Sequence, residues 1–235
     1  MNIMIIPDLH GRKFWRQAIA NNIDKVNKVI FLGDYLDPYN DPNLEDDPIE
    51  MLQDIINLKK NNPDKYTLLL GNHSIHYIWY NFPKSSRYDR FREKDYYNIF
   101  YNNLNLFNIA FVQDDVIFTH AGITNKWKEM CFPELTTLEV GKKLASEKLT
   151  ENGINFGYLA AISFYRGGTY ESGSCEWADV IEHLDSTGNP TKYENCYQVF
   201  GHTRVSKPVI TDTWACLDCQ KGFIIDTISH EISEC

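Results

Sequence analysis

The 235-residue sequence contains no apolar stretch long enough to cross a membrane. Its longest apolar runs fall far short of the roughly 20 residues that a spanning helix requires. The start of the sequence lacks the basic segment of a secretory signal and reaches the carboxylate of Asp8 too early for one. These absences favour a cytoplasmic protein with no membrane-embedded part.

The sequence also lacks a cysteine framework and an excess of basic residues. Its six cysteines show no regular spacing, which is typical of reduced thiols in the cytoplasm. Lysine and arginine number 23 against 32 acidic residues, so the formal net charge is −9. Because duplex nucleic acid binds to a basic stripe, this balance argues against such a partner. A small anionic substrate stays open, since divalent ions would reverse the local charge of a site.

The chain shows no internal repeat, low-complexity tract or interdomain linker, and a single domain over residues 1–235 is expected. Its first part alternates two kinds of segment. Apolar runs at 2–7, 29–32 and 66–70 predict buried strands, and residues 12–22 and 49–60 predict helices. This βαβαβ order indicates parallel strands.

The remainder of the chain is less regular. Residues 74–107 have a helical and aromatic pattern, residues 109–119 predict a hairpin, and a helix is expected from about Pro133 to Leu149. Three later runs predict the strands of a second, mainly antiparallel sheet: 197–200, 208–211 and 222–226. A helical layer on the sheet is the favoured interpretation of the aromatic segment, and a stacking platform for bases is the other.

Five apolar runs end in residues that can bind a metal ion. These residues are Asp8, His10, Asp34, Asn72, His120 and His202. In α/β sheets, ligands bind in the crevice at the carboxyl ends of the strands. Carboxylate, amide and imidazole groups together suit divalent first-row metals. Six such ligands exceed the four of a tetrahedral zinc site and match two ions roughly 3.5–4 Å apart.

Five short motifs contain these residues. They are Asp8-Leu9-His10-Gly11, Gly33-Asp34-Tyr35-Leu36-Asp37, Gly71-Asn72-His73, His120-Ala121-Gly122 and Gly201-His202-Thr203. In this order they resemble the motifs of the calcineurin-like metallophosphoesterases, over residues 8–203. His120-Ala121-Gly122 and Glu176-Trp177-Ala178-Asp179 are most similar to the branch of serine/threonine protein phosphatases and symmetrical diadenosine tetraphosphatases.

The resemblance implies a fold and a set of metal ligands. The fold would be an α/β four-layer α/β/β/α sandwich, in which two mixed β-sheets are flanked by helices. Asp8 and His10 would bind one ion, Asp34 would bridge both, and Asn72, His120 and His202 would bind the other. Manganese is the expected ion, and iron and zinc also suit these ligands.

The resemblance further implies roles in proton transfer and phosphate binding. His73 matches the general acid that protonates the leaving group, and Asp37 matches the carboxylate that orients it. Arg166 and Arg204 are candidate phosphate clamps beside Asn72, because a guanidinium can bind a phosphoryl group through two hydrogen bonds. Arg166 precedes two glycines, however, which is also typical of a surface turn.

Two positions depart from the protein phosphatase pattern. Pro38 and Tyr39 stand where that branch carries Arg-Gly, so one substrate arginine is missing, and Arg12 is a candidate replacement. Ser74 stands where the branch carries an acidic residue. These departures leave the substrate class open.

The expected activity is hydrolysis of phosphate monoesters by a metal-activated hydroxide, with a phosphoprotein or nucleotide as substrate. A dinucleoside polyphosphate hydrolase is an alternative, with the aromatic segment stacking a base. A nucleic-acid phosphodiesterase is disfavoured by the net charge, and a non-catalytic protein of the same fold by the complete ligand set. His76, His183 and His230 are expected to be structural or exposed. Neither the native metal nor the oligomeric state follows from the sequence.

Overall fold

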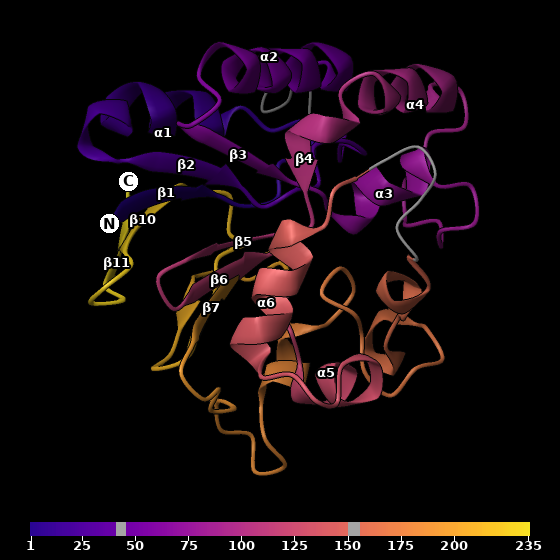
Figure 1. Cartoon of the computed structure of the whole chain (residues 1–235). Helices are drawn as coiled ribbons and strands as arrows, with labels where there is room; N and C mark the ends of the chain where they lie inside the picture. Colours follow the sequence, from indigo (N-terminus) through magenta and orange to yellow (C-terminus); the bar gives the residue numbers. More distant parts are fainter. Residues whose placement is uncertain (41–45, 150–155) are drawn as a thin grey trace.

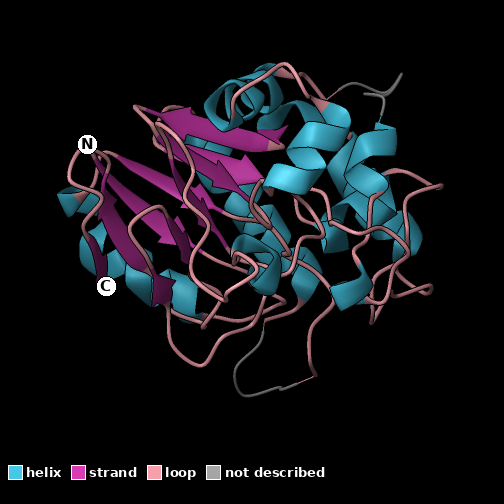
Figure 2. Cartoon of the chain, turned by 90° about the horizontal axis from the view of Figure 1, so that it is seen from below, coloured by secondary structure: helices cyan, strands magenta, loops and turns pink. Residues whose placement is uncertain are grey.

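Two β-sheets are stacked face to face with helices on their outer sides (Figures 1 and 2). The computed structural model describes residues 1–40, 46–149 and 156–235. The polar segment 38–47, which the sequence predicts to be a loop, therefore lies partly outside the described residues. The stacked sheets and their flanking helices confirm the expected α/β architecture.

The first sheet has the strand order β11-β10-β1-β2-β3-β4. Its strands are β1 (Asn2–Ile6), β2 (Lys28–Phe31), β3 (Tyr66–Leu69), β4 (Phe107–Asn108), β10 (Phe223–Asp226) and β11 (Ile232–Glu234). Strands β1 to β4 pair in parallel, and for β1, β2 and β3 this is the order that the alternation of strands and helices predicts. β10 pairs antiparallel with β1 and so belongs to this sheet, not to the second sheet to which the sequence pattern assigned it.

The second sheet has the order β5-β6-β7-β9-β8. Its strands are β5 (Ala110–Gln113), β6 (Val116–Thr119), β7 (Tyr197–Phe200), β8 (Val209–Ile210) and β9 (Trp214–Cys216). The predicted hairpin is present as β5 and β6. The expectation of a mainly antiparallel sheet is wrong, because β7 runs parallel to both β6 and β9. An apolar run reveals that a strand is buried but not which strand it pairs with.

Alternate residues of the central strands enter two different hydrophobic clusters. Ile3 and Ile5 of β1 point towards the second sheet, where they pack with Phe118 of β6. Met4 and Ile6 point to the other face, which the helices cover. Successive side chains of a strand point to opposite faces, so each central strand contributes to both layers. Each of these fully buried side chains contributes roughly 1.5–3 kcal/mol to stability.

The helices pack on the outer faces of the sheets. They are α1 (Phe14–Asn22), α2 (Pro48–Asn61), α3 (Asn72–Ile78), α4 (Glu93–Tyr101), α5 (Asn125–Cys131) and α6 (Thr137–Ser146). Figure 1 shows α1 and α2 over the first sheet, whereas α6 packs on β5 and β6. None of the helices in the described ranges combines the length and apolarity needed to cross a membrane.

Local signals explain where two of these helices begin. Asp47 caps α2 by accepting hydrogen bonds from the amides at 49 and 50, and Pro48 occupies the first helical position. Thr136 and Glu139 form a capping box, so α6 begins at Thr137, four residues later than expected. Helices α3 and α4 lie in the aromatic segment. Tyr96 and Phe100 are on the buried face of α4, which supports the helical-layer interpretation.

Candidate metal centre

The side chains that follow β1, β2, β3, β6 and β7 meet at one edge of the stacked sheets. A cavity of about 260 Å³ opens there. It is lined by His10, Asp34, Tyr39, Asn72, His73, Ser85, Ser86, Arg87, Arg166, Trp177, His202, Arg204 and Asp218. Asp8, Asp37 and His120 are buried next to these residues. The structure therefore brings the six predicted metal ligands, His73, Asp37, Arg166 and Arg204 to this region.

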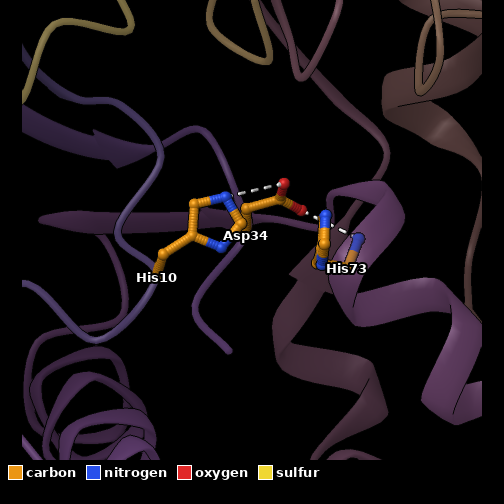
Figure 3. Close-up of side chains that lie close together, drawn as sticks. All are labelled: His10, Asp34 and His73. Atoms are coloured by element: carbon orange, nitrogen blue, oxygen red, sulfur yellow. Dashed lines mark hydrogen bonds and ion pairs between the residues drawn. The ribbon is translucent and has the colours of Figure 1, made fainter. Parts of the chain in front are cut away.

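Asp34 lies at the centre of the group. Its Oδ2 is 3.6 Å from Nε2 of His10 and 3.4 Å from Nε2 of His120. Its Oδ1 accepts a hydrogen bond of 2.9 Å from the amide of His73, so the carboxylate faces residues on both sides (Figure 3). Burial alone would raise the pKa of Asp34, but His120 and His73 hold it well below the usual value. An ionised carboxylate in this position can bind a divalent cation.

The rings of His10 and His120 are held by backbone carbonyls. Nδ1 of His10 lies 2.8 Å from the carbonyl oxygen of Leu36, and Nδ1 of His120 lies 3.0 Å from that of Leu32. A carbonyl only accepts hydrogen bonds, so Nδ1 carries the proton and the lone pair of the neutral ring is on Nε2. Metal-ligating histidines are typically oriented in this way.

Several lone-pair atoms converge around His120. Its Nε2 is 3.0 Å from Oδ1 of Asn72 and 3.0 Å from Nδ1 of His202. Burial would lower the pKa of His120, but the carboxylates of Asp34 and Asp8 raise it to about 10, so this cluster favours positive charge at its centre. A divalent cation would satisfy the same three atoms at once. The groups Asp34–His120–His202 and His10–Asp34–His73 each place ligand atoms within 4.8 Å of one another.

Two glycines permit this crowding. A Cβ at Gly71 would lie 2.3 Å from Oδ1 of Asp34, and a Cβ at Gly201 would lie 2.2 Å from Oδ1 of Asp8. Any other residue at either position would force the carboxylate to move. The glycines of the Gly-Asn-His and Gly-His-Thr motifs are thus required by the close approach of ligand and backbone.

The backbone of the site is strained as well as crowded. His10, Asp34, Asp37 and His202 have φ angles of 47°, 49°, 58° and 63°. This left-handed region is uncommon for residues other than glycine and costs roughly 1–3 kcal/mol at each position. The packed structure around the site imposes these conformations.

Buried polar atoms without partners provide a second indication of a cation. Within the described residues, both carboxylate oxygens of Glu176, Oδ1 of Asp218 and Nε2 of His202 have no hydrogen-bond partner. Burial raises the pKa of Glu176 well above its usual value and that of Asp218 to about 8. Asp218 was not predicted from the sequence. It follows β9 in the segment Cys216-Leu217-Asp218-Cys219, which has the Cys-x-x-Cys spacing of a zinc or redox motif but whose alternation predicts an ordinary hairpin or strand. The donor set as a whole fits divalent cations.

Next to this set, His73 and Asp37 form a buried pair. Nδ1 of His73 lies 2.6 Å from Oδ2 of Asp37. Burial alone would raise the pKa of Asp37, but its contacts with His73 and His76 hold it below its usual value. The carboxylate is therefore ionised at neutral pH and orients the His73 ring, whose other nitrogen is left for a ligand.

Three arginines line the cavity. Nε of Arg166 lies 3.0 Å from Oδ2 of Asp179, and its Nη2 donates to the carbonyl of His202 and to Oγ1 of Thr203. Arg204 is exposed at the rim. Arg87 was missed by sequence reasoning, because it stands in a loop between α3 and α4 and follows no strand.

Arg12, the suggested replacement for a missing substrate arginine, does not line the cavity within the described part of the chain. It is buried, with its guanidinium carbon 4.6 Å from the ring centroid of Tyr39. The Arg87 guanidinium carbon lies 3.8 Å from the same ring, and Nε of Arg87 donates to the carbonyl of Asp37. Arg87 is thus better placed than Arg12 to contact a bound anion.

Solved structures of phosphatases share this architecture. A cold-active protein-tyrosine phosphatase of a psychrophilic Shewanella species has a TM-score of 0.60 at 12% identity, over 99% of this chain and 80% of that one. A further structure of a cold-active protein tyrosine phosphatase has a TM-score of 0.62 at 15% identity, over 99% of this chain and 78% of that one. A serine/threonine phosphatase from Saccharomyces cerevisiae, with similarity to human phosphatase PP5, has a TM-score of 0.56 at 14% identity, over 95% of this chain and 71% of that one. At these identities the likeness establishes the fold alone.

No curated protein sequence matches the chain. Residues 1–210 match the profile of the calcineurin-like phosphoesterases, which covers the two sheets' central strands and all the motifs described above. The chain belongs to the calcineurin-like phosphoesterase family.

Proposed function

We propose that this protein hydrolyses phosphate monoesters with two divalent ions bound at the candidate metal centre. The observation that carries the proposal is the convergence of unshared electron pairs from Asp34, Asn72, His120 and His202, next to the His73–Asp37 pair. The first group suits cations and the second suits proton transfer to a leaving group. Both are reached from one cavity that arginines line.

The ligands divide into two sets around Asp34. Asp8 and His10 would hold one ion, and Asn72, His120 and His202 the other, with the Asp34 carboxylate between them. When bound, the two ions would lower the pKa of a water molecule and polarise the phosphoryl group. Manganese suits this mixed oxygen and nitrogen set, as do iron and zinc.

Protein side chains would supply the rest of the chemistry. His73, held through Nδ1 by Asp37, would donate a proton from Nε2 to the oxygen of the departing alcohol. Arg166 and Arg204 would neutralise charge on the phosphoryl oxygens, and Arg87 would take the place of the arginine missing beside Tyr39. The acid and the cations thus act on different oxygens of the substrate.

The test is a substrate panel assayed with manganese. Phosphopeptides, nucleotides, dinucleoside polyphosphates and aryl phosphates are compared for wild type, Asp34→Asn and the surface control Asp54→Asn. We expect Asp34→Asn to abolish turnover and reduce bound metal, and Asp54→Asn to behave as wild type. Wild-type turnover by Asp34→Asn, or by protein after exhaustive chelation, would refute the proposal.

A second candidate, hydrolysis of dinucleoside polyphosphates, is favoured by a larger hollow next to the site. It encloses about 1130 Å³ and shares His76 and Tyr77 with the surroundings of Asp37. Tyr80, Tyr88, Tyr97, Lys84 and Arg90 also line it, so both aromatic faces and positive charge are present. These are the groups that stack a base and bind a phosphate.

The matched variants Tyr80→Ala and Phe91→Ala decide between the two candidates. Both side chains are exposed, but only Tyr80 lines the hollow. Because stacking contributes roughly 1–3 kcal/mol per base, Tyr80→Ala should raise KM for a dinucleoside polyphosphate about tenfold or more and leave an aryl phosphate unaffected. Equal effects of the two variants would remove the support for a base in this hollow.

A further inference from the structure

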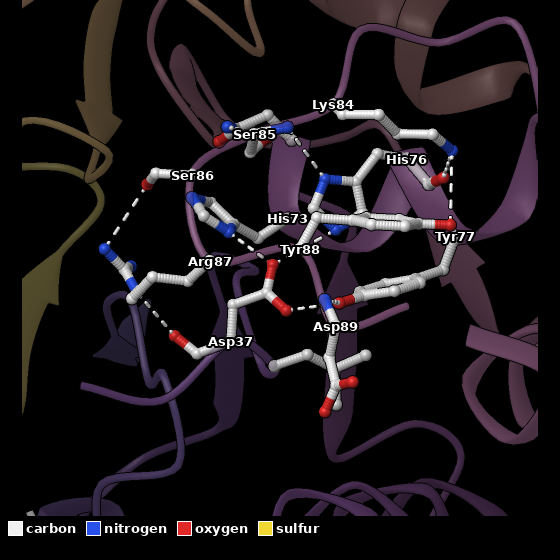
Figure 4. A network of polar contacts seen from close by, with 12 residues as sticks. Asp37, His73, His76, Tyr77, Lys84, Ser85, Ser86, Arg87, Tyr88 and Asp89 are labelled. Atoms are coloured by element: carbon white, nitrogen blue, oxygen red, sulfur yellow. Dashed lines mark hydrogen bonds and ion pairs between the residues drawn. The ribbon is translucent and has the colours of Figure 1, made fainter. Parts of the chain in front are cut away.

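The Asp37 carboxylate is held by more than His73. It is almost fully buried, and His73, His76 and Tyr77 of α3 surround it (Figure 4). Nε2 of His76 lies 3.1 Å from Oδ2, the same oxygen that His73 contacts, and the Tyr77 hydroxyl donates to Oδ1. The His76 contact is short but lacks the alignment of a good hydrogen bond. One turn of helix therefore encloses the carboxylate with three polar groups.

The hydrogen bond on the far side of the His76 ring fixes its tautomer. The amide of Ser85 donates to Nδ1 of His76 over 3.1 Å. An amide nitrogen cannot accept, so Nδ1 carries the lone pair and the neutral ring has its proton on Nε2, facing Asp37. Burial lowers the pKa of His76, which keeps the ring neutral. His76 is thus an uncharged donor towards the carboxylate. Because it does not neutralise Asp37, the negative charge of that carboxylate acts on the His73 ring.

Ser85 links the same ring to the candidate metal ligand Asn72. Nδ2 of Asn72 donates to Oγ of Ser85 over 2.8 Å, which turns Oδ1 of the amide towards His120. Only the oxygen of an amide can bind a cation, so this hydrogen bond selects the useful orientation of Asn72. The rings of Tyr77 and Tyr88 pack edge-on against the His76 ring, with centroid distances of 4.2 Å and 4.8 Å, and so fix the plane of the His76 ring.

We propose that His76 is a positioning residue with two separable roles, one through each ring nitrogen. Through Nε2 it holds Asp37 and so orients His73. Through Nδ1 it holds Ser85 and so orients Asn72. This inference rests on the proposed phosphoesterase function. It assigns a task to a buried histidine for which the sequence suggested only a structural or exposed role.

Two substitutions separate the roles. His76→Gln keeps an N–H group near the position of Nε2 but loses the acceptor for Ser85. His76→Asn keeps an oxygen acceptor near the position of Nδ1 but loses the donor towards Asp37. Each variant is compared with wild type for thermal unfolding, bound manganese, and kcat/KM on aryl phosphates whose alcohols differ in acidity.

The two variants should fail in opposite ways. His76→Asn should lower kcat/KM about 10- to 100-fold for alcohols that leave poorly, change it little for alcohols that leave well, and bind metal as wild type does. His76→Gln should keep the wild-type dependence on the leaving group and bind manganese about 10- to 100-fold more weakly. Parallel losses of metal and leaving-group assistance in both variants would overturn the two-role assignment.

Two readouts are independent of turnover. The ¹⁵N spectrum of wild-type protein labelled at histidine should show His76 protonated on Nε2, and a ring protonated on Nδ1 would overturn the inference. Manganese affinity of His76→Gln decides the link through Ser85 without any substrate. Absence of wild-type turnover across the panel would instead refute the proposed function, so the two failures are distinguishable.

Discussion

The backbone amide of His202 donates a hydrogen bond of 3.0 Å to Oδ1 of Asp8, which joins the last motif of the chain to the first. Asp8 follows β1 of the first sheet and His202 follows β7 of the second. Burial raises the pKa of Asp8 to about 6, and this amide opposes the rise by stabilising the ionised form. The contact fixes the position of a candidate ligand that follows a strand of the first sheet relative to the backbone that follows a strand of the second.

Gly201→Ala tests how much the centre depends on this close approach. A Cβ at position 201 would lie 2.2 Å from Oδ1 of Asp8, so the carboxylate must rotate away. We expect bound metal to fall and kcat/KM to drop at least tenfold, because an oriented ligand is worth roughly 10- to 100-fold in metal affinity. Metal analysis and steady-state kinetics measure the two effects.

Gly188→Ala is the matched control. Gly188 has a φ of 82°, and a Cβ there meets no atom within 4 Å. The substitution should lower the free energy of unfolding by about 1 kcal/mol through backbone strain and leave metal content unchanged. Similar metal loss in the two variants would show that the Asp8 contact is not the cause.

Asp37→Asn is expected to impair proton transfer. The amide cannot stabilise a positively charged His73 ring across the 2.6 Å contact that the carboxylate makes. Activity on phosphates of poorly leaving alcohols should fall by roughly 10²–10⁴-fold, and activity on aryl phosphates with acidic alcohols should fall much less. The slope of log kcat/KM against the pKa of the leaving alcohol measures this. A uniform loss across all substrates would contradict general acid catalysis by this pair.

Arg87→Met tests the arginine that the sequence did not reveal. Methionine keeps much of the apolar stem but removes the guanidinium that lines the cavity and contacts Asp37. A hydrogen bond to a charged group is worth roughly 1.5–3 kcal/mol, so kcat/KM should fall about 10- to 100-fold, mainly through KM. Arg16→Met is the control, because Arg16 pairs with Asp46 and Asp54 away from the cavity and should leave kinetics unchanged. Equal KM values for the two variants would exclude Arg87 from substrate binding.

His183 should make the protein less stable in mild acid. Burial lowers its pKa to about 4, whereas an exposed histidine has a pKa of about 6.5. Between these values the unfolded chain binds a proton that the folded chain does not. The free energy of unfolding therefore falls as the pH falls, by about 2 kcal/mol between about pH 7.5 and about pH 5. Denaturant unfolding of chelated protein measures the change.

His183→Gln supplies the comparison. Glutamine does not titrate, so the free energy of unfolding of the variant should fall less than that of wild type over the same pH interval. His183 stacks on Phe200 and lies 2.6 Å from the Tyr193 hydroxyl, so the variant will be less stable at both pH values. Only the difference between the two pH values is informative, and an unchanged difference would contradict the prediction.

The sequence predicted the parts of this molecule that depend on strand ends. An apolar run followed by Asp34 or His120 indicates both a buried strand and a candidate ligand at its carboxyl end, and parallel strands bring such ends together. The parallel order of β1, β2 and β3 was predicted for the same reason. Gly71 and Gly201 were recognised as parts of motifs, and the structure supplies their physical basis in the close approach of carboxylates.

Residues outside strand ends could not be predicted in this way. Arg87 reaches the cavity from an irregular loop, whose path depends on packing against Tyr39 and Asp37 and not on a local pattern. His76 lies one turn beyond His73 on a short helix, where a histidine is usually a packing residue. The pairing of β10 with β1 joins the two ends of the chain, and no local pattern records such a partner.

The candidate ligands come from both sheets: Asp8, His10, Asp34 and Asn72 follow strands of the first, and His120 and His202 follow strands of the second. Ions bound among them would act as a cross-link between the two layers. Occupancy and folding would then be thermodynamically linked, with a gain of RT ln(1 + [M]/Kd) for each independent site. At a free metal concentration about 100 times Kd this is about 2.7 kcal/mol, enough to make the melting temperature report the metal supply.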